Sequence, residues 1–166
     1  MTLNDADKPM SGVFTAFGYA AFWAFMWEAE LAALALTLRR IRSPKITPSE
    51  LDQFDAETRR KNVGQVLDKE LGELLKGHAA LKQFCKKTTD SRNRLIHHFY
   101  EEQLPMLVTD EGKRLSENEL EMIATELRTG CAFIKEIYMQ IARSQFDTVD
   151  SVLADAQDRL IKLWKA

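Results

Sequence analysis

The sequence predicts an all-α protein, a helical bundle of about five helices with a long N-terminal helix. Glycine and proline are few, 7 and 4 among 166 residues, which favours long helices over a turn-rich β fold. Apolar residues recur three or four positions apart along several segments, the spacing of a buried helix face. The composition, 45% hydrophobic and 29% charged, is ordinary for a soluble globular protein, and the length suits one domain. We therefore expect a flexible tail over residues 1–10 and a single helical-bundle domain over residues 11–166.

The first helix is predicted from Ser11 to Arg42, and its first half is aromatic in nearly every direction. A helix that is apolar all round is either buried on all sides or lies in a membrane. Its uncharged stretch, residues 9–27, is 19 residues long, which is near the length of a membrane span. The aromatic residues are Phe14, Phe17, Tyr19, Phe22, Trp23, Phe25 and Trp27.

Other residues favour a soluble setting for this helix. Asp5 and Asp7 precede it, whereas a signal peptide starts with basic residues. Ser11, Gly12 and Thr15 shorten its truly apolar part. We therefore expect no membrane, and a helix packed between its own bundle and a second copy of the chain in an isologous homodimer. Attachment to a membrane is the minor alternative.

A second helix, or a broken pair of helices, is predicted from Pro48 to Lys76. Thr47 suits the N-cap, Pro48 suits the first helical position, and Glu50 completes a capping box. The basic cluster at residues 59–61 is either a solvated helix face or a phosphate clamp. The apolar residues expected to face inward are Leu51, Phe54, Val63, Val66, Leu67, Leu71 and Leu75.

The central helix is predicted over residues 78–103, and it carries an arginine within its apolar stripe. The stripe consists of Leu81, Phe84, Cys85, Thr88, Arg92, Ile96 and Phe99. A charge in such a stripe is unfavourable unless it is paired or lies in a wet cleft. Between residues 82 and 98, five basic side chains accompany the single carboxylate of Asp90. This local positive charge makes the central helix the best candidate for binding an anionic ligand.

Asn93, His97 and Tyr100 form the row next to this stripe. His97 follows Arg92 by five residues, which corresponds to about 140° around an α-helix. We therefore expect the two side chains to meet only in a groove that both flank, or across a pair of such helices, and not within one helix.

Two more helices are predicted in the C-terminal third. Pro105 ends the central helix, and residues 107–115 are expected to form a surface loop. Ser116 opens a second capping box, which predicts a helix to about Arg143. Its core face is Leu120, Ile123, Leu127, Cys131, Ile134, Tyr138 and Ile141. The last helix, capped by Asp147, is expected to pack through Val152, Leu153, Ala156, Leu160 and Trp164.

Other features of the sequence limit which metals, cofactors and ligands the protein is expected to bind. Cys85 and Cys131 lie on apolar faces and form no metal-like pair, so we expect buried, reduced thiols and a cytoplasmic location. The net charge is −2, so any RNA binding requires a local basic patch. The sequence has no glycine-rich phosphate loop, no paired-cysteine or His-Glu-x-x-His motif and no nucleophile elbow. We therefore expect no metal and no cofactor.

The central helix resembles the motif helix of the HEPN superfamily. Arg92 and Asn93 are followed, after Arg94, Leu95 and Ile96, by His97, which matches an arginine, a polar residue and a later histidine. The resemblance implies a helical bundle that dimerises, with the two motif helices lining a shared cleft. Many members cut RNA without a metal ion. It therefore implies a metal-independent endoribonuclease of a defence, toxin or stress system.

The resemblance also implies roles for the residues of the motif. His97 would transfer protons, because histidine titrates near neutral pH. Arg92 would bind the phosphate, because its guanidinium is always charged and offers a fork of donors. Asn93 would orient the imidazole or a substrate oxygen. Substrate-binding contacts are expected from Arg94, His98 and Tyr100.

An antitoxin or regulatory protein is a further partner that the resemblance implies. In one class of HEPN toxins a tyrosine two residues after the motif histidine is modified by a nucleotidyltransferase antitoxin. Phe99 occupies that position in this chain, and Tyr100 follows it. An antitoxin of that class therefore lacks its usual target residue here.

The alternative is a binding or interaction module without catalysis. Arg92 would then pair with a buried carboxylate such as Glu28 or Glu30, and His97 would be a structural histidine. HEPN-like domains without activity serve as scaffolds, so the fold alone does not decide between the two functions.

Overall fold

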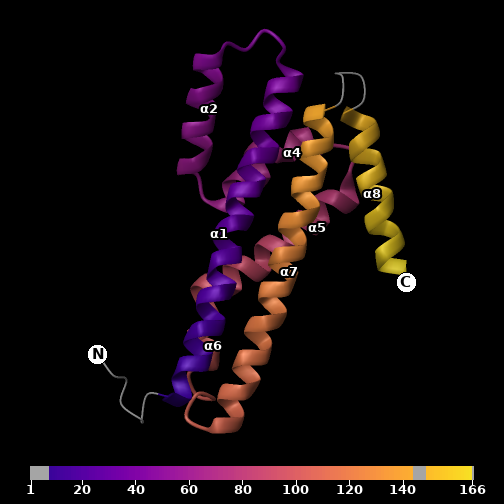
Figure 1. Ribbon diagram of the computed structural model, residues 1–166. Helices are drawn as coiled ribbons and strands as arrows, with labels where there is room; N and C mark the ends of the chain where they lie inside the picture. Colours follow the sequence, from indigo (N-terminus) through magenta and orange to yellow (C-terminus); the bar gives the residue numbers. More distant parts are fainter. Residues whose placement is uncertain (1–7, 144–148, 166) are drawn as a thin grey trace.

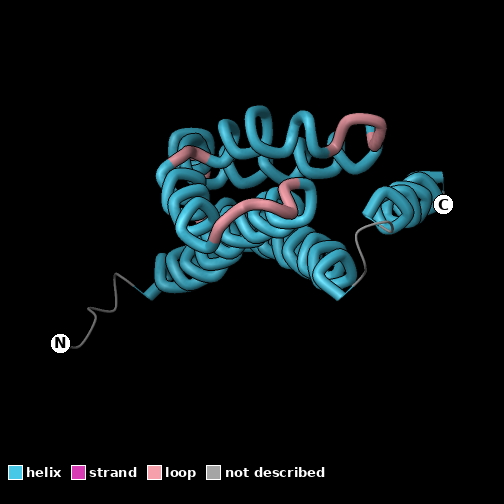
Figure 2. Tube along the Cα trace, turned by 90° about the horizontal axis from the view of Figure 1, so that it is seen from above, coloured by secondary structure: helices cyan, strands magenta, loops and turns pink. Residues whose placement is uncertain are grey.

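The computed structural model describes residues 8–143 and 149–165, and these residues form a bundle of helices without any strand (Figure 1). Seen from above, the helices are joined by short connections (Figure 2). The predicted all-α fold with a long N-terminal helix is therefore confirmed. The helical elements are α1 Lys8–Arg42, α2 Pro48–Arg60, α3 Val63–Gln65, η2 Val66–Glu70, α4 Leu71–Leu74, α5 Ala79–Asn93, η3 Arg94–His98, α6 Phe99–Gln103, α7 Asp110–Arg143 and α8 Val149–Lys165.

Several helix boundaries follow from local sequence. Thr47 accepts a hydrogen bond from the backbone N–H of Glu50, whose carboxylate accepts one from the backbone N–H of Thr47, so the predicted capping box is present. Helix α1 begins at Lys8, three residues before the predicted start. Residues 1–7 of the expected tail, and Asp147 as the expected cap of α8, lie outside the described residues.

Helices α1 and α7 lie side by side and run in the same direction (Figure 1). Their contact is close at Gly130, where a Cβ would lie 3.1 Å from the ring of Trp27 on α1 and 2.9 Å from Thr88 Cγ2 on α5. The central helix α5–η3–α6 crosses α1 in the opposite direction, with Thr89 near Trp27 and Tyr100 near Phe17. The long first helix is thus held on two sides by the rest of the chain.

The two remaining helices cover the ends of this assembly. Helix α2 folds back along the C-terminal half of α1, where the guanidinium of Arg39 lies 5.6 Å from the ring centre of Phe54. Helix α8 packs against α5 and α7. Gln157 accepts a hydrogen bond from the backbone N–H of Ala80 at 3.2 Å, and Arg159 donates to Glu136 at 2.7 Å.

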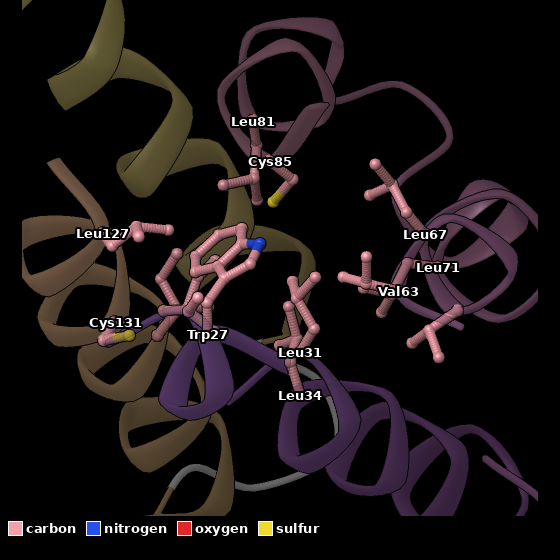
Figure 3. Close-up of a cluster of buried hydrophobic side chains, with 14 of the residues drawn as sticks. Trp27, Leu31, Leu34, Val63, Leu67, Leu71, Leu81, Cys85, Leu127 and Cys131 are labelled. Carbon is pink, nitrogen blue, oxygen red and sulfur yellow. The ribbon is translucent and has the colours of Figure 1, made fainter. Parts of the chain in front are cut away.

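The centre of the core is the indole of Trp27, which is fully buried. Around it lie apolar side chains from α1, α5, α7 and the segment from α3 to α4 (Figure 3). Its indole N–H donates to Thr89 Oγ1 at 3.1 Å, so the one polar atom of the ring is satisfied. Burial raises the pKa values of the Cys85 and Cys131 thiols to about 12, and both cysteines are free and buried as predicted.

The predicted loop over residues 107–115 is too long, since only residues 107–109 of it lie outside a helix, and the predicted cap at Ser116 is wrong. Helix α7 already begins at Asp110, because Thr109 accepts hydrogen bonds from Gly112 and Lys113 at its start. Ser116 is buried inside the helix and donates to the carbonyl of Gly112. A Cβ at Gly112 would overlap the carbonyl of Met106, so this glycine permits a close approach of two backbones.

The aromatic residues of α1 divide between the core and the surface. Trp27 is buried, whereas Phe14, Phe22 and Phe25 are 57%, 53% and 68% exposed. These three form one row on the helix, at spacings of eight and three residues. The segment Met10–Arg42 is long and apolar enough to cross a membrane, and 44% of its most apolar stretch is buried inside the molecule.

The C-terminal core faces are largely as predicted. The expected stripe of α7 is buried except for Tyr138, which is half-buried, and Ile137 is buried in addition. In α8, Leu153, Ala156 and Leu160 are buried as expected. Trp164 was expected to pack against the core, but it is 48% exposed and lines a cavity between α5 and α7.

The hydrogen bond of Trp27 can be tested with two neighbouring threonines. Thr89→Val leaves the buried indole N–H without its acceptor, so we expect the free energy of unfolding to fall by about 1–3 kcal/mol. Thr88→Val is the matched control, because the Thr88 hydroxyl donates to the Phe84 carbonyl of its own helix. For this control we expect a loss below about 1 kcal/mol. Urea denaturation measures both, and equal losses would contradict this role of Thr89.

Candidate functional site

The central helix contains a π-helical turn, η3, between Arg94 and His98. The backbone N–H of Phe99 donates to the carbonyl of Arg94, five residues earlier. Such a turn holds more residues than an α-helical one. The side chains that follow are therefore shifted around the axis, so that Leu95 and Phe99 are buried, whereas Ile96, expected in the core, is 39% exposed.

The wide turn brings Arg92 and His97 together. Arg92 Nη1 lies 3.3 Å from His97 Nε2, although the two residues were expected to be about 140° apart on a regular helix. The expectation that one helix cannot join them is wrong, because it assumed α-helical geometry through residues 94–98. Asn93 belongs to the same group, since its Oδ1 accepts a hydrogen bond from Arg92 Nη1 at 3.0 Å.

Arg92 is anchored to the first helix. Its Nη2 forms a charged hydrogen bond with Glu28 Oε1 on α1, one of the two partners that the sequence suggested. The Arg92 side chain is only 16% exposed, and the ion pair compensates part of the desolvation of its charge. Its Nε is buried and has no hydrogen-bond partner among the described residues.

This contact places the imidazole against a donor. A guanidinium can only donate hydrogen bonds, so His97 Nε2 accepts in the contact with Arg92 Nη1. His97 itself is exposed, whereas Arg92 is mostly covered. A histidine at the surface therefore touches a fixed cation, an arrangement suited to acid–base chemistry at a phosphate.

The other three candidate residues point to different partners. Arg94 binds Glu102 at 2.8 Å and Glu119 at 2.5 Å, and the hydrogen bond to Glu102 is the main cause that raises its pKa. The His98 side chain is 61% exposed and lies 3.9 Å from Glu101. These two residues do not join the group around Arg92.

Tyr100 also lies apart from that group. It packs against Phe17 of α1, with 4.8 Å between the ring centres. Burial raises the pKa of its hydroxyl. Tyr100 thus contributes to the contact between α1 and α6.

The cavities and possible ligand sets complete the description. A cavity of about 780 Å³ lies between α5 and α7. It is lined by Arg94, Glu126 and Trp164, among others, but not by Arg92 or His97. A smaller one, of about 260 Å³, is lined by Glu28 and so adjoins Arg92. Within residues 8–143 and 149–165, no group of three or more His, Cys, Asp or Glu side chains could hold a metal ion.

Sequence analysis missed several residues of the smaller cavity. Thr58 and Phe25 come from α2 and α1 and carried no motif that points to a ligand. The basic cluster at residues 59–61 was the one available signal, since Arg59 and Lys61 both line this cavity. Comparison with known proteins adds no assignment: no protein-family model, curated protein or solved structure matches the chain.

The anchoring of Arg92 can be measured by comparing it with Arg94. Arg92→Ala removes a mostly buried charge from its carboxylate, so we expect the free energy of unfolding to fall by about 2–3 kcal/mol. Arg94→Ala removes the same chemical group from a site that is 44% exposed, and we expect a loss below about 1 kcal/mol. Denaturant titration of the two variants measures the difference. A larger loss for Arg94→Ala would contradict the structural role of Arg92.

Proposed function

We propose that the chain is a metal-independent endoribonuclease of the HEPN type that acts through a cleft shared by two copies. The observation that carries the proposal is the contact between the exposed His97 and the anchored Arg92. A cation beside an imidazole suits cleavage of RNA at the ribose 2′-hydroxyl. The local excess of basic residues on the central helix suits a polyanionic substrate.

The reaction divides the tasks between these side chains. When RNA binds, a phosphate oxygen accepts the hydrogen bond from Arg92 Nη1 that His97 Nε2 accepts in the free protein. His97 Nε2 then becomes available as a base. It removes the proton of the 2′-hydroxyl, whose oxygen attacks the phosphorus. The bond from phosphorus to the 5′-oxygen breaks, and this oxygen takes a proton from the second copy's proton-transfer group. The products are a 2′,3′-cyclic phosphate and a 5′-hydroxyl end.

A second copy of the chain supplies that second group. The exposed row of Phe14, Phe22 and Phe25 on α1 is an apolar surface of the kind that isologous interfaces cover. The row borders the site, because Phe25 lies one turn before Glu28 and both line the same cavity. A dimer built on Phe14 and Phe22 therefore brings two Arg92–His97 pairs toward one cleft.

A second candidate function is a binding module without catalysis. The ion pair between Arg92 and Glu28, and the hydrogen bond to Asn93, occupy much of the guanidinium. In this case the group holds α5 against α1, and RNA is not cut.

The two candidates are separated by cleavage of a mixed RNA pool in EDTA. We expect His97→Ala to lower the cleavage rate by about 10²–10⁴-fold, the usual effect of losing a proton-transfer group. His78→Ala is the matched control, because this histidine lies at the N-cap of α5, at the opposite end of that helix from Arg92; its rate should stay close to that of the wild type. Absence of cleavage by every variant favours the binding module. Equal cleavage by wild type and His97→Ala refutes the assigned site.

The dimer is tested with charged substitutions of exposed residues. Phe22→Glu inserts a carboxylate into the aromatic row, and we expect a monomer by light scattering together with loss of RNA cleavage. Met122→Glu is the control, because Met122 is 73% exposed on α7 and away from that row. It should remain a dimer. A wild-type protein that is monodisperse as a monomer would contradict the shared cleft.

A further inference from the structure

The small cavity beside Arg92 has an apolar wall and a polar end. It measures about 260 Å³ and lies between α1 and the segment that joins α2 to α3. The wall is formed by Ala29, Ala32, Val63 and Val66. Glu28, which bonds Arg92, also lines it, so the cavity and the Arg92–His97 pair share one side chain.

We propose that this cavity is a specificity subsite that holds one unpaired base of the RNA next to the bond that is cut. The inference rests on the proposed function, and it adds a residue that reads the base, Thr58. Sequence-specific recognition of RNA acts mainly on unpaired bases, which stack on aromatic rings and form hydrogen bonds through their edges.

Thr58 carries the polar part of the argument. The residue is 2% exposed, and its Oγ1 is buried without a hydrogen-bond partner among the described residues. An unpaired buried hydroxyl destabilises a protein. Thr58 lines the cavity, so a ligand that enters the cavity can satisfy its hydroxyl by donating or accepting a hydrogen bond.

The volume and the apolar wall of the cavity indicate which ligand fits it. Cavities for drug-sized ligands have volumes of roughly 300–1,000 Å³, and this one is smaller, which suits a base without its sugar and phosphate. The alanine and valine side chains offer an apolar surface to the flat face of a base. Phe25, at 68% exposure, also lines the cavity, and its ring can stack on a base.

The phosphate of the same nucleotide has a cation at the rim. Arg59 lines the cavity, its side chain is 58% exposed, and it is paired with Asp55 at 2.8 Å. Exposed ion pairs contribute little to stability, so a phosphate can compete for this guanidinium. Lys61 is bound to Glu70 at 2.5 Å and is less exposed, which makes Arg59 the phosphate contact.

The experiment measures binding of the four nucleoside 5′-monophosphates by calorimetry, separately from RNA cleavage. We expect one of them to bind in preference to the others. Thr58→Val should weaken its binding at least about tenfold without lowering the melting temperature, because valine replaces a hydroxyl that has no partner in the free protein. Ala29→Leu, which fills the cavity, should also abolish binding.

Two neighbouring arginines provide the electrostatic control. Arg59→Ala should weaken binding more than Arg60→Ala, because both remove one charge but only Arg59 lines the cavity. Equal effects of the two, or unchanged binding in Thr58→Val and Ala29→Leu, would overturn the subsite. Absence of binding by all four monophosphates would overturn it as well.

The results also distinguish this inference from the function on which it rests. If Thr58→Val weakens nucleotide binding but the wild type cuts no RNA, the subsite is supported and the nuclease function is refuted. If RNA cleavage depends on His97 but wild type and Thr58→Val prefer the same base, the nuclease function is supported and the subsite is refuted.

Discussion

The wide turn between Arg94 and His98 controls how the central helix meets α1. Before this turn Thr89 and Arg92 face α1, where they contact Trp27 and Glu28. After it the buried positions are Leu95 and Phe99, and His97 returns to the side of Arg92. A regular α-helix would place Ile96 in the core and turn His97 away from Arg92. Core packing and the candidate site therefore depend on the same irregular hydrogen bond, from Phe99 to Arg94.

Three sides of helix α1 make different contacts. One side packs along α7 and holds Trp27 in the centre of the core. A second side carries Glu28, which fixes the guanidinium of the central helix. A third side exposes Phe14, Phe22 and Phe25. The nearly continuous apolar sequence of α1 thus reflects two surfaces, one buried within the chain and one left for a further contact.

The parts of the structure that sequence analysis predicted depend on local rules. The capping box at Thr47 was predictable because its two partners are three residues apart. The same rule failed at Ser116, because Thr109 offers an earlier cap and Gly112 allows the chain to pack closely before it. Arg92 was recognised as a charge in an apolar stripe and Glu28 as one of two possible partners, but only the packing of α5 on α1 selects between them.

The geometry of the candidate site was beyond such rules. The contact between Arg92 and His97 requires a π-helical turn, and no residue type in Arg94–His98 predicts such a turn. The cavity around Thr58 brings together residues of α1 and α2 that are far apart in the sequence. Thr58 looks like an ordinary helical threonine in the sequence, and its missing hydrogen-bond partner is visible only after folding.

The wide turn also bears on how the spacing of the motif can change during evolution. A π-helical turn amounts to a single-residue insertion into an α-helix. Removing one residue between Arg92 and His97 would leave them four apart, where they are neighbours on a regular helix. An ancestor with the shorter spacing and a descendant with the longer one could therefore hold the same pair of side chains in the same place. A difference of one residue in the spacing between such an arginine and histidine therefore need not change which side chains meet.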